Sequence, residues 1–128
     1  MNTKSSTHPE LTETELEVMK TLWSQGESSA REAHERLAHR LGWAYTTSRT
    51  TLDRMVDKGL VERRSSHGLY LYDAAVSRPV GLAGLVQRLA GRVLEVEASR
   101  VVSLFTEGLE LSAEEVAELE ALIEESEP

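Results

Sequence analysis

Residues 43–72 read WAYTTSRTTLDRMVDKGLVERRSSHGLYLY, a segment that combines a helix pattern with a pattern of two short strands. Apolar residues recur at helical spacing from Thr46 or Thr47 to Lys58, which predicts a helix there. Two strand-like runs follow at once on either side of Ser66-His67-Gly68 and predict a β-hairpin. A helix followed by a hairpin that carries an arginine pair is typical of proteins that read DNA.

The predicted helix has an inner apolar face centred on Leu52, with Ser48, Met55 and Val56 within about 60° of it. Its outward face carries hydroxyls and arginine, whereas an ordinary solvated helix carries mostly Glu and Lys. Threonine can bind a phosphate or touch a thymine methyl, and arginine can bridge two acceptors on guanine. The expected DNA contacts are Thr46, Thr47, Arg49, Thr50 and Arg54 on the helix and Arg63 and Arg64 in the hairpin.

The hairpin is expected to pair residues 60–65 with residues 69–73. Side chains alternate between the two faces of a strand. Tyr70 and Tyr72 should therefore share one face, and Leu69 and Leu71 the other.

Two helices should precede this segment, because two capping boxes begin runs of helical periodicity. The first helix is expected from Thr12 to about Gln25, and the second from the Ser29 capping box to Leu41. Trp43-Ala44-Tyr45 is expected to be an extended linker. Three helices and a hairpin in this order indicate a winged helix-turn-helix domain.

Ser77-Arg78-Pro79 is expected to break the pattern and to mark the boundary of the C-terminal part, because a proline biases the preceding residue away from helix. A long helix is expected from Leu82 to about Glu107, and a final one after a capping box at Ser112. Two helices cannot easily bury both apolar stripes of the longer one, so either a second copy or the chain's own N-terminal domain should cover them. We favour the second copy, because two helix-turn-helix units related by a two-fold axis match a palindromic site. The expected dimerisation residues are Leu82, Leu85, Leu89, Val93, Val101, Phe105, Leu119, Leu122 and Ile123.

The fold class expected from these patterns is mainly α with a small β-hairpin. Residues 1–9 are expected to be a disordered tail. A winged-helix DNA-binding domain is expected over 10–76, and a helical dimerisation domain over 77–128.

Charge is unevenly distributed along the 128 residues. Residues 1–78 hold eleven basic and eleven acidic side chains, and residues 79–128 hold three arginines and eleven glutamates. The whole formal net charge of −8 therefore lies in the C-terminal part. Residues 28–72 carry eight basic and five acidic side chains, a local excess that suits a DNA-binding surface.

Several classes of function are excluded by composition and motif. The chain has no cysteine, and its four histidines are scattered, so we expect solvated histidines and no metal or other cofactor. It lacks a glycine-rich phosphate loop, a nucleophile elbow and a metalloprotease motif, which argues against an enzyme. No small-molecule ligand is evident. No segment resembles a signal peptide or membrane span, so we expect a cytoplasmic protein without membrane insertion.

The rival interpretation is a winged-helix adaptor that docks a partner protein and does not bind DNA. Such an adaptor could carry acidic residues on this surface, and the chain does have Asp53, Asp57 and Glu62. We expect these three to lie at the flank or the C-terminal end, away from the groove contacts. DNA binding is therefore the favoured interpretation.

The blocks LTETELEVMKTLW, AYTT with RTTLDRMVDKGLVERR, and YLY resemble the penicillinase repressor family of the BlaI/MecI/CopY type. The resemblance covers Leu11 to about Ile123. It implies a homodimeric repressor that binds an inverted-repeat operator in double-stranded DNA. Members typically control resistance or metal-homeostasis genes, so a resistance or stress-related gene set is the expected target.

The resemblance also implies a release mechanism. In the β-lactam branch, a membrane sensor protease system triggers cleavage of the dimerisation helix before a phenylalanine. Leu104 and Phe105 form the candidate proteolytic-release site. Leu104 stands where those repressors usually have asparagine, which argues against cleavage and β-lactam sensing here. The copper branch uses a cysteine cluster, which this chain lacks.

Overall fold

The computed structural model describes residues 9–90, 102 and 110–126. The chain divides into two compact units. One comprises Leu11–Ser77, and the other combines Met1–Glu10 with Arg78–Pro128. Each unit contains buried apolar side chains of its own.

The first unit begins with three helices, α1 (Glu13–Gln25), α2 (Ala30–Leu41) and α3 (Tyr45–Asp57). The two predicted capping boxes are confirmed: Thr12 caps α1 and Ser29 caps α2. The linker prediction is wrong at Tyr45, which is the first residue of α3. The helix starts there because Ala44 has the extended backbone of an N-cap residue.

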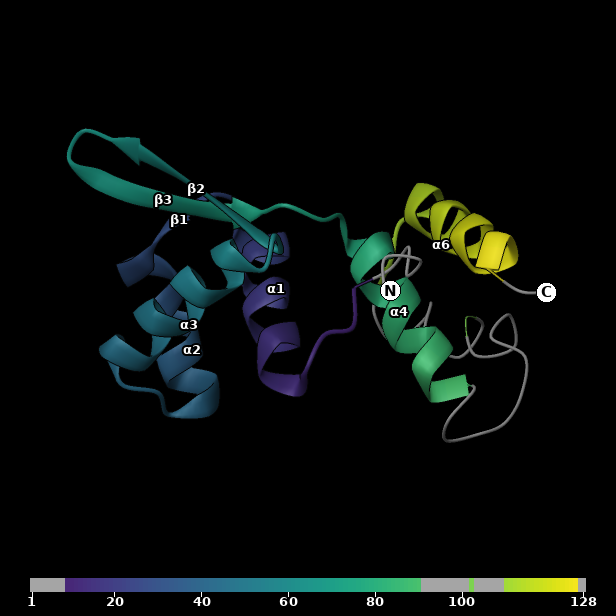
Figure 1. Cartoon of the computed structure of the whole chain (residues 1–128), viewed down its shortest axis with the longest axis horizontal. Coiled ribbons are helices and arrows are strands. Elements are labelled where there is room, and N and C mark those ends of the chain that lie inside the picture. The colour runs from purple at the N-terminus through teal and green to yellow at the C-terminus, as the bar shows by residue number, and fades with distance from the viewer. Residues whose placement is uncertain (1–8, 91–101, 103–109, 127–128) are drawn as a thin grey trace. The chain divides into compact units, whose positions relative to one another are not determined.

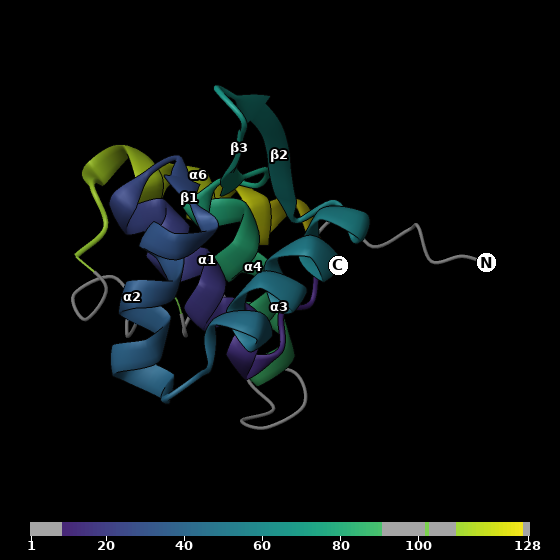
Figure 2. The ribbon, with the colours of Figure 1, turned by 90° about the vertical axis from the view of Figure 1, so that its left-hand side faces the viewer.

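A three-stranded antiparallel sheet completes this unit (Figures 1 and 2). The predicted hairpin is β2 (Val61–Ser66) and β3 (Leu69–Ala74), and β3 lies in the middle of the order β1-β3-β2. The third strand, β1 (Ser28–Ser29), was not predicted. Two residues are too few to show the alternation by which a strand is recognised in a sequence.

The hairpin turn contains two residues, His67 and Gly68, with φ values of 51° and 81°. Positive φ at both central residues is the mark of a type I′ turn, whose twist matches that of the flanking strands. The turn lies at the projecting end of the hairpin, which extends beyond the helices (Figures 1 and 2). We call the hairpin β2–β3 the wing.

The core of this unit joins the three helices to the base of the wing. Tyr72 of β3 is fully buried, and the Trp23 indole donates a hydrogen bond of 3.0 Å to the Val76 carbonyl. The buried apolar residues are Leu11, Val18, Met19, Leu22, Ala30, Ala33, Leu37, Leu52, Met55, Leu60, Val61 and Tyr72. The mainly α fold with a small sheet is thus confirmed.

In the second unit, α4 spans Arg78–Arg88, so the predictions that Pro79 keeps Arg78 out of a helix and that the helix starts at Leu82 are wrong. A proline in the first turn of a helix loses no hydrogen bond, because its N–H would have no partner there. The final helix, α6 (Ala113–Ser126), begins as predicted, with the Glu115 amide donating to the Ser112 hydroxyl at 3.1 Å. Residues 91–101 and 103–107 of the predicted long helix lie outside the described residues.

The helices α4 and α6 are joined by a forked ion pair. Arg78 donates from Nε and Nη2 to the two carboxylate oxygens of Glu115, at 3.0 and 2.7 Å. These hydrogen bonds lower the pKa of Glu115. Leu82 and Val86 of α4 are buried, as are Leu119 and Ile123 of α6. The apolar stripes of both helices therefore contribute to one packed unit.

Candidate nucleic-acid interface

The outward face of α3 is exposed as predicted. Thr46, Thr47, Thr50 and Arg54 are open to solvent, and Arg49 is half-buried on the flank. The opposite face is anchored in the core by Ser48, Leu52 and Met55, which are buried. Because residues on a helix repeat every 100°, burial of these three fixes the direction of the threonines and of Arg54.

The N-terminal end of α3 differs from those of α1 and α2. Within the described part of the chain, no side chain caps it, because Ala44 occupies the capping position. The first amides of a helix carry a partial positive charge and attract anions. An uncapped start with Thr46 and Thr47 beside it is compatible with a phosphate contact.

A cluster of α2 and α3 residues supports this end of α3. His34 Nδ1 lies 2.8 Å from the buried Ser48 hydroxyl, and its ring meets Tyr45 edge-on at 5.5 Å. The Arg31 guanidinium lies 4.2 Å above the Tyr45 ring. The expectation of a solvated histidine is therefore wrong for His34, which is half-buried and links two helices. The sequence did not predict that Arg31 and Tyr45 belong to this site, because only the packing of α2 against α3 brings them together.

Asp53 connects α3 to the wing. Its carboxylate accepts hydrogen bonds from Arg49 Nε at 3.3 Å, Arg63 Nη1 at 2.9 Å and the Tyr72 hydroxyl at 2.7 Å. Both guanidinium groups also approach the Tyr70 ring, at 5.8 Å for Arg49 and 4.7 Å for Arg63. We call Asp53, Arg49, Arg63, Tyr70 and Tyr72 the Asp53 cluster.

The predicted position of Asp53 is therefore wrong. It was expected away from the groove contacts, but it binds two of the residues expected to make them, Arg49 and Arg63. The error arises because helix geometry places Asp53 on the flank of α3 but does not show that the wing packs against that flank. The shared face of Tyr70 and Tyr72 was inferred from alternation, and both rings belong to this cluster.

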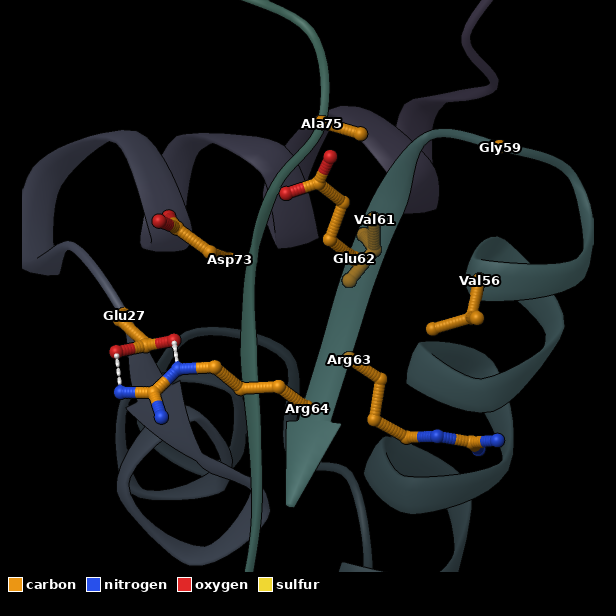
Figure 3. A pocket seen from close by; sticks show the side chains of 9 residues that line it. All are labelled: Glu27, Val56, Gly59, Val61, Glu62, Arg63, Arg64, Asp73 and Ala75. Atoms are coloured by element: carbon orange, nitrogen blue, oxygen red, sulfur yellow. Dashed lines mark hydrogen bonds and ion pairs between the residues drawn. The ribbon is translucent and has the colours of Figure 1, made fainter. Parts of the chain in front are cut away.

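Arg64 has a different partner from its neighbour Arg63. It donates from Nε and Nη2 to the two carboxylate oxygens of Glu27, at 2.6 and 2.8 Å. Figure 3 shows Arg64 reaching past β3 to Glu27, while Arg63 points the other way, toward α3. The hydrogen bonds from Arg64 lower the pKa of Glu27. Both wing arginines thus have carboxylate partners.

An open hollow of about 560 Å³ lies between the wing and the C-terminal end of α3 (Figure 3). Charged side chains make up much of its lining, and its two guanidinium groups are those already paired with Asp53 and Glu27. It is lined by Glu27, Val56, Gly59, Val61, Glu62, Arg63, Arg64, Asp73 and Ala75. The hollow is open to solvent and has many charged side chains in its lining, unlike the apolar, enclosed sites that small molecules prefer.

The predicted dimerisation residues fall into two groups. Leu82 is buried on α4, and Leu85 and Leu89 are half-buried after it. On α6, Leu119 and Ile123 are buried and Leu122 is half-buried. Val93, Val101, Leu104 and Phe105 lie outside the described residues.

Among residues 9–90, 102 and 110–126, no group of three or more histidine, aspartate or glutamate side chains gathers as metal ligands would. No helix in the same residues combines the length and the apolar character needed to cross a membrane.

Comparison with known proteins supports a regulatory role. Residues 11–125 match the model of the penicillinase repressor family. The chain is 26% identical over 117 residues to the penicillinase repressor of Bacillus licheniformis, covering 91% of each chain. It is 25% identical to the methicillin resistance regulatory protein MecI of Staphylococcus aureus strain N315, covering 89% of this chain and 93% of that one. The chain therefore belongs to the penicillinase repressor family.

Proposed function

We propose that this repressor acts as a homodimer on an inverted-repeat operator in double-stranded DNA, through the outward face of α3 and the wing. Members of its family are transcriptional regulators and not enzymes. The observation that carries the proposal is the exposed row Thr46, Thr47, Thr50 and Arg54 on a helix whose opposite face is anchored in the core. This is how a recognition helix is presented to the major groove.

Affinity and sequence choice would come from different residues. Arginine and lysine contacts to phosphate supply most of the affinity but carry no sequence information. Thr50 and Arg54 lie one helical turn apart and would reach base edges. Arg64 would exchange Glu27 for phosphate as the wing meets the backbone, and Arg63 would reach phosphate with the N–H groups that it does not use on Asp53. The bound dimer would block transcription by occupying the promoter.

A two-fold dimer would place two recognition helices on successive turns of the duplex, about 10 base pairs apart. Leu85 and Leu89 support this, because they are spaced by one turn on α4 and stay partly exposed in the single chain. The names of the relatives favour a resistance or stress-related gene set as the target. An operator-binding repressor would act in the cytoplasm. Release by a membrane sensor protease at Leu104–Phe105 stays a prediction.

The test is selection of duplexes from a random pool with the full-length protein, followed by a gel-shift titration of the selected duplex at two salt concentrations. We expect an inverted repeat to emerge. If about six phosphates are neutralised per dimer, log K should fall against log salt with a slope near −5.

Failure to enrich any sequence, with no shift at low salt, would instead favour the protein-interaction adaptor. The observation behind that second candidate is the pairing of Arg49, Arg63 and Arg64 with acidic residues, which reduces the positive charge of the surface.

A further inference from the structure

The Asp53 cluster places one carboxylate between the two parts of the interface. Arg49 belongs to α3 and Arg63 to β2, and both donate to Asp53, one to each oxygen. Tyr72, directly opposite Arg63 in the β2–β3 ladder, donates to the same oxygen as Arg63. The recognition helix and the wing are therefore joined by two arginine side chains that donate to the same Asp53 carboxylate.

The electrostatics of the cluster favour a single arrangement. Two guanidinium groups that approach the same Tyr70 ring repel each other, and the carboxylate to which both donate offsets this repulsion. Burial alone would raise the pKa of Asp53, but hydrogen bonds from Tyr72 and Arg63 outweigh it and hold this pKa below its usual value. The carboxylate is consequently charged at neutral pH, and its oxygens fix where both arginines lie.

We propose that Asp53 is a specificity-determining positioning residue, which holds Arg49 and Arg63 so that the helix and the wing fit one DNA geometry. The inference rests on the proposed function, since it assigns a role within that interface. A carboxylate near DNA repels phosphate, so charge alone predicts tighter binding without it. Positioning predicts weaker binding to the selected site, because arginines that are no longer held by the carboxylate are displaced from the bases and phosphates that they contact.

Glu27, the residue directly before β1, offers a matched control. Its side chain is 33% exposed and that of Asp53 is 36% exposed, and both accept from wing arginines. Glu27 holds Arg64 alone, by a forked pair at the edge strand, with no bond to α3 among the described residues. Its removal should free one cation for phosphate without altering the relation of helix to wing.

The experiment compares full-length wild type with Asp53→Asn and Glu27→Gln, each of which removes one charge at nearly constant shape. The probes are the selected duplex and a scrambled duplex of the same composition, and the readout is the ratio of the two affinities. For Glu27→Gln we expect both affinities to rise alike and the ratio to hold. For Asp53→Asn we expect the ratio to fall about tenfold, the amount expected from one misplaced arginine contact.

A third variant separates geometry from charge and guards against misfolding. Asp53→Glu keeps the charge and moves the carboxylate by one methylene, so the ratio should fall while the affinity for the scrambled duplex stays the same. Circular dichroism and thermal melting without DNA establish that each variant is folded. If Asp53→Asn does not fold, Asp53→Glu carries the test.

Three results would overturn the proposal. The first is a folded Asp53→Asn, or in its place Asp53→Glu, with the ratio of wild type. The second is an equal fall of the ratio in Glu27→Gln. The third is a wild-type protein that does not distinguish the two duplexes, which would remove the proposed function together with this inference.

Discussion

Thr50 and Arg54 are the most direct test of the interface at the scale of single residues. Both are exposed on α3, and neither side chain has a bonding partner within the described residues. We expect Thr50→Ala and Arg54→Ala each to weaken binding to the selected duplex by about 1–3 kcal/mol, the value of a good base contact. The free energy of unfolding should change by less than about 0.5 kcal/mol, because both sites are on the surface.

The measurements are gel-shift titration of the selected duplex and urea denaturation of the free protein. Thr14→Ala is a suitable control, because Thr14 is an exposed threonine in the first turn of α1, away from the proposed interface. A footprint unchanged by both α3 substitutions would remove this helix from the readout.

Local rules were enough to place these residues but not their partners. Helical periodicity gave the buried face of α3 around Leu52, and capping patterns gave the starts of α1 and α2. The pairing of Arg64 with Glu27 spans 37 positions and crosses β3, and it depends on the unpredicted strand β1. The role of Asp53 likewise depends on packing between α3 and the sheet. Long-range pairs of this kind leave no periodic signal in the chain.

At the scale of the element, the wing turn requires an unusual backbone conformation at two residues. Gly68 and His67 both have positive φ, a conformation that costs an L-residue about 1–2 kcal/mol and glycine almost nothing. A Cβ added at Gly68 would meet nothing within 4 Å, so the strain of a substitution is conformational and not steric.

We therefore expect Gly68→Ala to lower the free energy of unfolding by about 1 kcal/mol, and His67→Asn to raise it slightly, since asparagine tolerates this region better. Urea denaturation of the full chain measures both. Equal stability of the three proteins would show that the turn does not adopt this conformation in solution.

The contact between α1 and the end of α3 should make the first unit sensitive to acid. The buried Glu15 completes the α1 capping box and forms an ion pair with Lys58. Burial alone would raise the pKa of Glu15, but hydrogen bonds from Lys58 and Thr12 lower it below its usual value of 4.5. Because the folded protein has the lower pKa, the stabilisation is complete above 4.5 and is lost as pH falls through the folded value.

We expect the free energy of unfolding to decrease as pH falls below 4.5, and Glu15→Gln to remove part of this dependence. Glutamine has nearly the shape of glutamate and can still accept the capping hydrogen bond. The change in the free energy of unfolding at neutral pH therefore measures the contribution of the Glu15 charge. Denaturation curves measured between about pH 3 and 7 give the comparison. A pH profile identical in both proteins would show that the Lys58 pair does not stabilise the fold.

At the scale of the whole molecule, the hydrogen bonds at the end of the first unit determine where a fragment can end and still fold. The Ala75 amide donates to the Leu60 carbonyl at 2.9 Å, and the Val76 carbonyl accepts from the Trp23 indole. A fragment ending at Asp73 would lose both bonds and the last residue of β3. A fragment that ends at Ser77, the last residue of that unit, retains both bonds.

We expect fragment 1–77 to fold cooperatively and to be a monomer at micromolar concentration, because it lacks α4 and α6. Linked half-sites gain at least about a hundredfold from their effective concentration, so the fragment should bind the selected duplex more weakly by that factor. It should bind an isolated half-site as well as the full-length protein does. Sedimentation and gel-shift titration test both statements. A dimeric fragment would place the subunit interface within the winged helix, and the inverted repeat would then require a different spacing of the two recognition helices.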